Sequence, residues 1–333
     1  MRGRVVVKCL ITACFVGFLC HDDVKAASFS VNFLRCRELA GIQTKAISML
    51  PTVVPDSLGA ADRTGTQLFA SIHGDRLQKR GSTGFGYQVT MKGLFCGVEH
   101  ICQLENICKH LRFGAIAGYI GGGAYFSALS DKAKKKADAQ EIISGTALVG
   151  YDVLGENDLP ININFWGGIY YSKNDIHEYI YIFQEKIGAK GKFGAIEVVK
   201  ILHGKNGVQI GPWTLLNYNH ARLKQSGSCA NIYNFFDGTF GFALKSEHQA
   251  FISRDHGFHL KCGCQCRLVP EQSNELRVSF QQIPNYVARN SFVLASGLRV
   301  AMKPGWEFAA TLRTVLSKDE KTCAASLRLE YNF

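Results

Sequence analysis

Three cysteines alternate with other residues in the segment 261–267, KCGCQCR, and are the side chains best suited to chemistry. Thiolates this close together could bind zinc or copper. On a β-strand, however, residues two apart share one face and lie about 7 Å apart, so their sulfur atoms form a row that cannot converge on one ion. We therefore interpret Cys262, Cys264 and Cys266 as small apolar side chains. Cross-linking and metal binding are the alternatives.

Two histidines and two cysteines, His100, Cys102, Cys108 and His110, stand symmetrically around a segment that we interpret as a turn. Their spacing matches no specific zinc-ligand pattern. We favour a disulfide between Cys102 and Cys108, provided that the two backbones approach within about 7 Å. Zinc is the alternative. Nine of the 12 cysteines follow residue 26, and in an oxidising compartment an odd number leaves at least one thiol free or bonded to another molecule.

Acidic residues and histidines lie close together at His73-Gly74-Asp75 and at Asp255-His256. Hydrolysis by this chemistry also needs an activated serine. Neither pair has a motif such as Gly-x-Ser-x-Gly beside it, and ten histidines will form such pairs by chance. We therefore predict no catalytic, cofactor-binding or metal-binding residues and no enzyme activity, and an enzyme is the alternative class.

The first 26 residues are typical of an export signal. Three basic residues, Arg2, Arg4 and Lys8, precede the apolar stretch 9–20. This stretch has 12 residues, which is too short to span a bilayer as a helix. Val24 and Ala26 provide the small residues of a cleavage site, so we expect cleavage after Ala26. A lipoprotein signal ending at Cys14 is the alternative.

The chain is basic, with a formal net charge of +11. Residues 1–26 hold four basic and two acidic residues, so cleavage would leave +9. An exported chain does not routinely meet nucleic acid, and we predict no nucleic-acid partner. The charge run 131–138, DKAKKKAD, is interpreted as the solvated face of an outward loop, and attraction to acidic lipopolysaccharide or glycans is the alternative.

The elements that position these residues are predicted to be β-strands. The chain has 34 glycines but only seven prolines, which favours tight turns and crowded strands. Apolar residues recur with a period of two, most clearly at the end of the chain, where Leu327, Leu329, Tyr331 and Phe333 alternate with Ser326, Arg328, Glu330 and Asn332. In a membrane-spanning barrel, one face of such a strand meets lipid and the other meets the lumen.

About twelve segments of this kind follow residue 65, and they predict an all-β, closed antiparallel transmembrane β-barrel over residues 66–333. Short connections at 155–159, 203–207 and 303–305 would lie at the inner rim, and longer ones at 127–139 and 270–290 at the outer rim. The expected strands are 66–76, 85–98, 110–126, 140–152, 160–172, 178–202 with a break near Lys186, 207–221, 232–246, 250–268, 275–302 with a break near Arg289, 304–316 and 321–333.

Two other segments could be helical. Residues 113–130 carry no charge and repeat glycine at the spacing of paired membrane helices, but the triplet 121–123 disfavours a helix. Residues 27–65 form a short leader, in which 32–50 is a plausible helix stopped by Pro51. This helix could lie in or below the pore, or the leader could be loosely ordered.

The stretch from Thr64 to Phe333 resembles the C-terminal translocator domain of autotransporters, the type V secretion family. The resemblance rests on the twelve-segment layout, on the phrase 208–218, VQIGPWTLLNY, and on the ending 327–333, LRLEYNF. It implies a twelve-stranded barrel with a central helix, inserted by the outer-membrane assembly machinery. The assembly signal would be Leu327, Leu329, Tyr331 and Phe333. Family members carry a long passenger, whereas about 40 residues separate Ala26 from the first expected strand.

We therefore predict an exported bacterial outer-membrane protein, a membrane-embedded translocator or surface-exposed barrel with little or no passenger. Its expected partners are outer-membrane lipid, lipopolysaccharide and the assembly machinery, and it would be a monomer unless disulfides link it to other molecules. The cysteine content is similar to that of the cross-linked envelopes of chlamydia-like bacteria. A cysteine-cross-linked structural envelope protein is a further alternative.

Overall fold

A computed structural model describes residues 64–79, 86–104, 110–127, 134–154, 160–178, 183–205, 208–225, 231–247, 256–269, 290–303, 305–318 and 320–333. The expected cleavage site at Ala26, the expected helix 32–50 and Cys108 lie outside these residues. Among the residues that the structure describes, no helix is long and apolar enough to cross a membrane.

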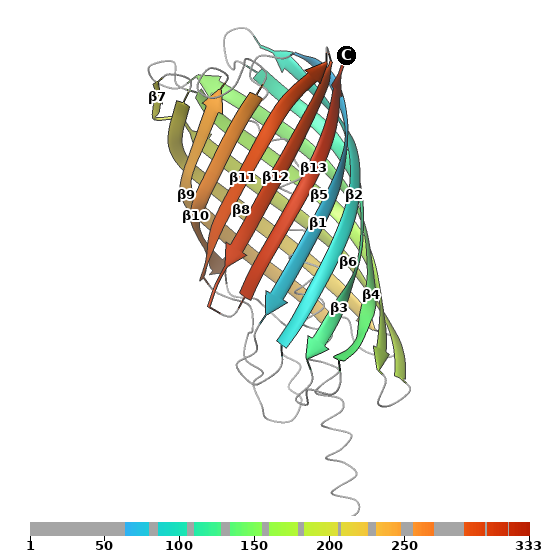
Figure 1. Cartoon of the computed structure of the whole chain (residues 1–333). Helices are drawn as coiled ribbons and strands as arrows, with labels where there is room; N and C mark the ends of the chain where they lie inside the picture. The colour runs from blue at the N-terminus through green and yellow to red at the C-terminus, as the bar shows by residue number, and fades with distance from the viewer. Residues whose placement is uncertain are drawn as a thin grey trace, which may run out of the picture.

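The described residues form antiparallel strands (Figure 1). Their bounds are β1 Gly65–Lys79, β2 Gly86–Gln103, β3 His110–Ser127, β4 Lys134–Leu154, β5 Pro160–Glu178, β6 Phe183–Lys200, β7 His203–Lys205, β8 Val208–Gln225, β9 Asn231–Glu247, β10 His256–Val269, β11 Asn290–Lys303, β12 Trp306–Leu316 and β13 Glu320–Asn332. The segment 113–130, considered above as a helix, therefore lies largely in β3.

The sheet closes on itself because its first strand pairs with its last and β6 pairs with β8. β1 pairs with β13 along its length, from Gln67 opposite Asn332 to Lys79 opposite Glu320. β6 pairs with β8, while β7 is a three-residue strand that pairs only with the start of β8. The wall therefore consists of twelve strands, and the prediction of a closed barrel of about twelve strands is confirmed. Closure satisfies the backbone hydrogen bonds of every neighbouring pair, which a bilayer requires because it offers no water to an open edge.

Two predicted boundaries were wrong, at the start of β4 and at the break near Lys186, whereas the start of β11 agrees with the predicted break near Arg289. β4 begins at Lys134, which lies opposite Ser127 of β3, so the charge run 131–138 belongs largely to a strand. Backbone pairing continues here because ladder hydrogen bonds do not depend on apolar side chains. The predicted break at Lys186 lies instead between Glu178 and Phe183. β11 begins at Asn290, and residues 275–289 lie outside the described part of the chain.

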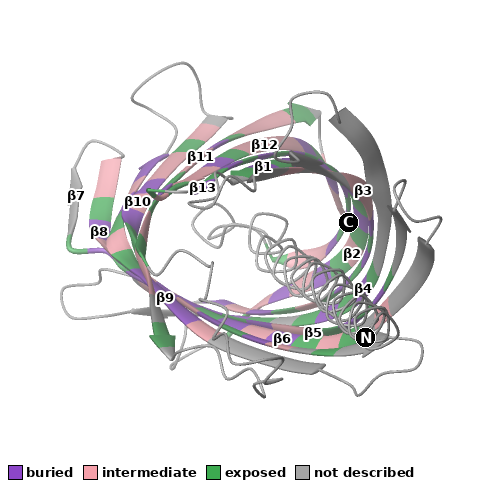
Figure 2. Ribbon diagram, turned by 90° about the horizontal axis from the view of Figure 1, so that it is seen from below, coloured by how far each residue is buried: buried purple, intermediate pink, exposed green. Residues whose placement is uncertain are grey.

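The two faces of the wall differ in polarity. In β13 buried and exposed residues alternate along the strand (Figure 2). Leu327 is 51% exposed on the outer face, whereas Arg328 is 6% exposed and Glu330 1% exposed on the inner face. Apolar side chains outside and charged side chains inside are the reverse of a water-soluble protein and suit a barrel in lipid.

Glycine is required at two points of the wall, one because of a close approach between strands and one because of the backbone conformation of a turn. Gly241 of β9 lies opposite Gly263 of β10, and a Cβ atom added at Gly241 would overlap the carbonyl oxygen of Cys262. Gly305 joins β11 to β12 with a φ of +84°, in the left-handed region that favours glycine. The short connection expected at 303–305 is therefore present.

Candidate functional site

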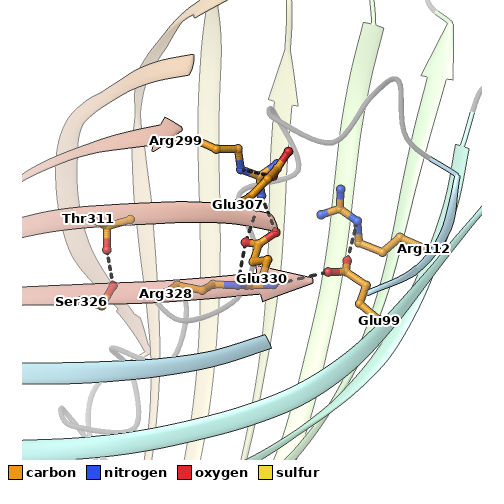
Figure 3. A network of polar contacts seen from close by, with 8 residues as sticks. All are labelled: Glu99, Arg112, Arg299, Glu307, Thr311, Ser326, Arg328 and Glu330. Carbon is orange, nitrogen blue, oxygen red and sulfur yellow. Dashed lines mark hydrogen bonds and ion pairs between the residues drawn. The ribbon is translucent and has the colours of Figure 1, made fainter. Parts of the chain in front are cut away.

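The most extensive side-chain structure among the described residues is a chain of charges on the inner face of the barrel (Figure 3). It consists of Arg112 of β3, Glu99 of β2, Arg328 and Glu330 of β13, Arg299 of β11 and Glu307 of β12. We call these six residues the seam network. All six residues lie near the rim of the barrel where Phe333 lies. Each is within four residues of the strand end at that rim; Arg328, for example, is four residues before Asn332, where β13 ends.

One end of the seam network joins β3 to β13. The guanidinium Nε of Arg112 lies 2.6 Å from Oε1 of Glu99. Nη2 of Arg328 lies 3.8 Å from Oε2 of the same carboxylate. Glu99 is 1% exposed, so its charge is balanced by these two cations rather than by bulk water.

The other end joins β13 to β11 through a second buried carboxylate. Oε1 of Glu330 lies 2.7 Å from Nε of Arg328. Nη2 of Arg299 donates to both carboxylate oxygens of Glu330, at 3.2 and 3.3 Å. Nε of Arg299 also lies 3.4 Å from Oε2 of Glu307. Positive and negative side chains therefore alternate, and the three arginines balance the three glutamates.

The seam network crosses the strand pair that closes the barrel. β1 lies between β2 and β13, and it contributes the aromatic ring of Phe69. The guanidinium carbon of Arg328 lies 3.6 Å from the centre of that ring, a cation–π contact. Planar guanidinium groups suit this role because one arginine can bridge two carboxylates and stack on a ring at once. The network therefore ties the first strand of the barrel to the last.

A second cluster lies across the interior from β6 to β10. Nζ of Lys261 lies 2.8 Å from Oε1 of Glu197, and the indole nitrogen of Trp213 donates to the same oxygen at 2.9 Å. β8 and β9 separate β6 from β10 in the sheet, so this ion pair spans the inner surface rather than two paired strands. Arg313 of β12 also interacts electrostatically with Glu197. Charged side chains thus neutralise one another deeper in the lumen too.

The expected assembly signal lies on the outer face of β13. Leu327 and Leu329 are 51% and 40% exposed, and Phe333 is 71% exposed. The ring of Tyr331 lies 4.8 Å from Trp306 and 4.9 Å from Phe333, between ring centres. The backbone nitrogen of Phe333 donates to the carbonyl of Thr66 at 3.0 Å. The structure therefore brings these residues together at one rim, and their role in assembly stays a prediction.

The cysteine row of β10 has the orientation that the alternation predicted. Cys264 is exposed and Cys262 and Cys266 are half-buried, whereas Lys261, directly before Cys262, points inward to Glu197. Phe240 and Phe292 lie opposite Cys264 on the two neighbouring strands. Within the described part of the chain, no group of three or more His, Cys, Asp or Glu side chains could hold a metal ion.

The four residues around the turn after β2 do not form one site among the described residues. The thiol of Cys102 donates to the carbonyl of Leu111 at 3.6 Å. Nδ1 of His100 lies 2.9 Å from the hydroxyl of Thr66. Cys108 lies outside the described residues, so its disulfide with Cys102 stays a prediction.

The alternation did not identify the seam network, although it carries a signal for it. Every second residue counted back from Phe333 faces outward, so Arg328 and Glu330, which lie between them, face inward. The alternation on the other strands places Glu99, Arg112 and Glu307 inward in the same way. Nothing in the sequence gives the relative shift of the five strands that carry these residues, so the pairing of their charges required the structure.

Solved structures with a similar fold support this architecture. The translocator domain of the autotransporter NalP from Neisseria meningitidis has a TM-score of 0.60 at 15% identity, covering 89% of this chain and 96% of that one. The transport unit of the autotransporter AIDA-I from Escherichia coli has a TM-score of 0.63 at 10% identity, covering 88% and 98%. The β-domain of the Bordetella autotransporter BrkA has a TM-score of 0.57 at 12% identity, covering 81% and 100%.

Sequence comparison gives no match to a protein-family model or to a curated protein. The structural likeness therefore carries the comparison, and at these identities it concerns the fold. The expected resemblance to autotransporter translocator domains is confirmed at this level: the chain has the closed twelve-stranded fold of an autotransporter translocator barrel.

Proposed function

We propose that this protein is an autotransporter-like barrel of a bacterial outer membrane, which holds or translocates a segment of the chain that precedes β1. The observation that carries this proposal is the division of the wall into two faces. Outward side chains such as Ile72 and Ile169 are 64% and 72% exposed, and burying such side chains in lipid is favourable. The inner face is lined by polar and charged side chains.

The charge balance of the lumen suits a wall that a peptide can pass. Each charge of the seam network lies within 3.8 Å of an opposite charge, and Lys261 is paired with Glu197. A paired wall presents hydrogen-bonding groups without a strong field of one sign, so it neither holds nor repels a segment because of its net charge.

We further propose that the chain is exported by cleavage after Ala26 and inserted by the outer-membrane assembly machinery. The exposed side chains of Leu327, Leu329 and Phe333, together with the half-buried Tyr331, would provide the surface that this machinery recognises. Strand addition is a common way for a protein to recognise a peptide segment, and β13 is the strand that completes the wall.

A tag-accessibility experiment in intact Gram-negative cells tests the proposal. An epitope with a protease site is inserted in the leader between residues 27 and 64, in the connection 270–289, or in the connection 155–159. The two connections join strands at opposite rims, so one is a matched control for the other. We expect cleavage of the tags at 270–289 and in the leader, and protection at 155–159 until the cells are opened. Protection of all three tags in intact cells would contradict the proposal.

A further inference from the structure

Basic side chains gather on the outer face of β6 and β8. Lys190 lies directly opposite Arg222, and Lys192 directly opposite His220. We call these four residues the basic array. Lys190, Lys192 and Arg222 are exposed and His220 is half-buried. Residues directly opposite on antiparallel strands have Cβ atoms about 5 Å apart, so the array places at least three cations close together on the surface that faces lipid.

Three cations of the array, Lys190, Lys192 and Arg222, differ from the charges inside the barrel in their pairing. Among the described residues, no ion pair involves Lys190, Lys192 or Arg222, whereas every arginine of the seam network is paired. Like charges directly opposite on a sheet are destabilising. An arrangement of this kind gains stability when a bound anion supplies the missing negative charge.

The array stands at the edge of the apolar band of the wall. On the outer face of β6, exposed Lys200 lies near the rim of Phe333. Ile196, 37% exposed, lies on the same face between Lys200 and the array. Ten residues separate Lys200 from Lys190, which is about 33 Å along a strand and about 25 Å in height at the usual tilt of barrel strands. An apolar band in outer-membrane barrels has about this height. Lys190 therefore lies at the membrane surface opposite to the rim of Phe333.

Apolar surface lies beside the array on β5. Tyr171, 48% exposed, lies opposite Lys190, and Ile169, 72% exposed, lies opposite Lys192. Phe165, 40% exposed, lies farther along the same face toward the rim of Phe333. A ligand with a phosphate at the array and acyl chains along β5 would match both the charge and the polarity of this surface.

We propose that the basic array binds a phosphate group of lipid A, the membrane anchor of lipopolysaccharide, with its acyl chains against β5. The inference rests on the proposed orientation, in which the rim opposite Phe333 is at the outer leaflet. Phosphate attracts the array, while the acyl chains favour Ile169 and Phe165. An attraction of this kind weakens with ionic strength, because the array is exposed to water.

Native mass spectrometry of the full barrel, folded in detergent, tests the proposal with three probes. These are bisphosphorylated lipid A, the same lipid after removal of both phosphates, and inorganic phosphate. The array variant is K190Q/K192Q/R222Q. The matched control is R76Q/K92Q/K321Q, which also removes three exposed cations from the outer face, but on β1, β2 and β13, where the register puts no two of them directly opposite. Heat-modifiable gel mobility verifies that each protein is folded.

We expect a one-to-one complex of the unchanged barrel with bisphosphorylated lipid A. The array variant should need at least about tenfold more lipid, since each cation near a membrane surface contributes roughly a fivefold effect. The control variant should stay within twofold of the unchanged barrel. The dephosphorylated lipid should bind at least tenfold more weakly, and inorganic phosphate should not displace the complex at a hundredfold excess.

Several results would overturn the assignment. Equal binding of both lipid forms to the unchanged protein would show that only the acyl chains matter, and this arm needs no variant. An equal loss in the control variant would indicate bulk attraction rather than a site. Displacement by inorganic phosphate would indicate a phosphate site that does not require lipid. The tag experiment and the binding experiment fail separately. If the tags show the proposed orientation but the barrel binds no lipid A, only the lipid A site is disproved. If the barrel binds lipid A but the tags show the opposite orientation, the proposed function is disproved.

Discussion

Replacing Glu330 with glutamine tests the seam network most sharply. The carboxylate of Glu330 is 1% exposed and contacts Arg328 at 2.7 Å and Arg299 at 3.2 and 3.3 Å. The E330Q variant leaves three arginines facing two glutamates on the inner wall. Removing one partner of a buried ion pair costs about 3–5 kcal/mol. Arg299 is partly accessible, at 18% of its side chain, so we expect the lower end of that range.

The E307Q variant is the matched control because it makes the same chemical change in the same network. Glu307 lies 3.4 Å from Arg299, and in this variant Arg299 keeps its contacts with Glu330. We expect a loss of about 1 kcal/mol, because E307Q weakens one long ion pair whose arginine is partly accessible and stays paired with Glu330. At about 2 °C per kcal/mol for a chain of this size, the two variants should differ by about 4 °C in unfolding midpoint.

The assay is the temperature at which the detergent-folded barrel loses its heat-modifiable gel mobility, supported by urea unfolding. The double variant R328M/E330Q provides a further check, because it leaves the complete pairs Arg112 with Glu99 and Arg299 with Glu307. It should be more stable than E330Q alone, since no buried charge is left uncompensated. Equal midpoints for E330Q and E307Q, or a double variant less stable than E330Q alone, would refute the reasoning.

Three further predictions concern the wall itself. The G241A variant should fold poorly, because its Cβ atom would overlap the carbonyl oxygen of Cys262. The control G145A should fold normally, because nothing lies within 4 Å of its added Cβ atom. The yield of folded protein measures both variants. Cys264 should react with a membrane-permeant maleimide in lipid vesicles and not with a charged one, and equal reaction with both would place it outside the apolar band. Deletion of Phe333 should lower the amount of folded protein in the outer membrane several-fold without changing refolding in detergent, and an equal loss in detergent would show that Phe333 acts only on stability.

The fold followed from the sequence because polarity alternates strictly where lipid and lumen face opposite sides of a strand. In β13 the alternation is unbroken from Glu320 to Glu330, and a shift of one residue would place Arg328 in lipid. The strand ends were less predictable. Lys134 continues a ladder beyond the apolar band, where side-chain polarity no longer reports on backbone pairing.

The site was only partly predictable. The outward row of Cys262, Cys264 and Cys266 followed from the same alternation, and the structure confirms its orientation. The ion pair of Lys261 with Glu197 joins residues 64 positions apart, and it depends on how far each strand is shifted along its neighbour. Periodicity gives the face of a residue but not its height, so neither the seam network nor the basic array could be assembled from the sequence.

The central claim is that the chain forms a closed barrel whose outer face is apolar and whose lumen is charged. Gel migration of the detergent-folded protein with and without heating, measured together with its circular dichroism spectrum, tests this claim most directly. We expect two bands, the unheated one of different mobility, and a spectrum dominated by β-structure that persists until the temperature at which the bands merge. A single band at all temperatures, or a predominantly helical spectrum, would contradict the account.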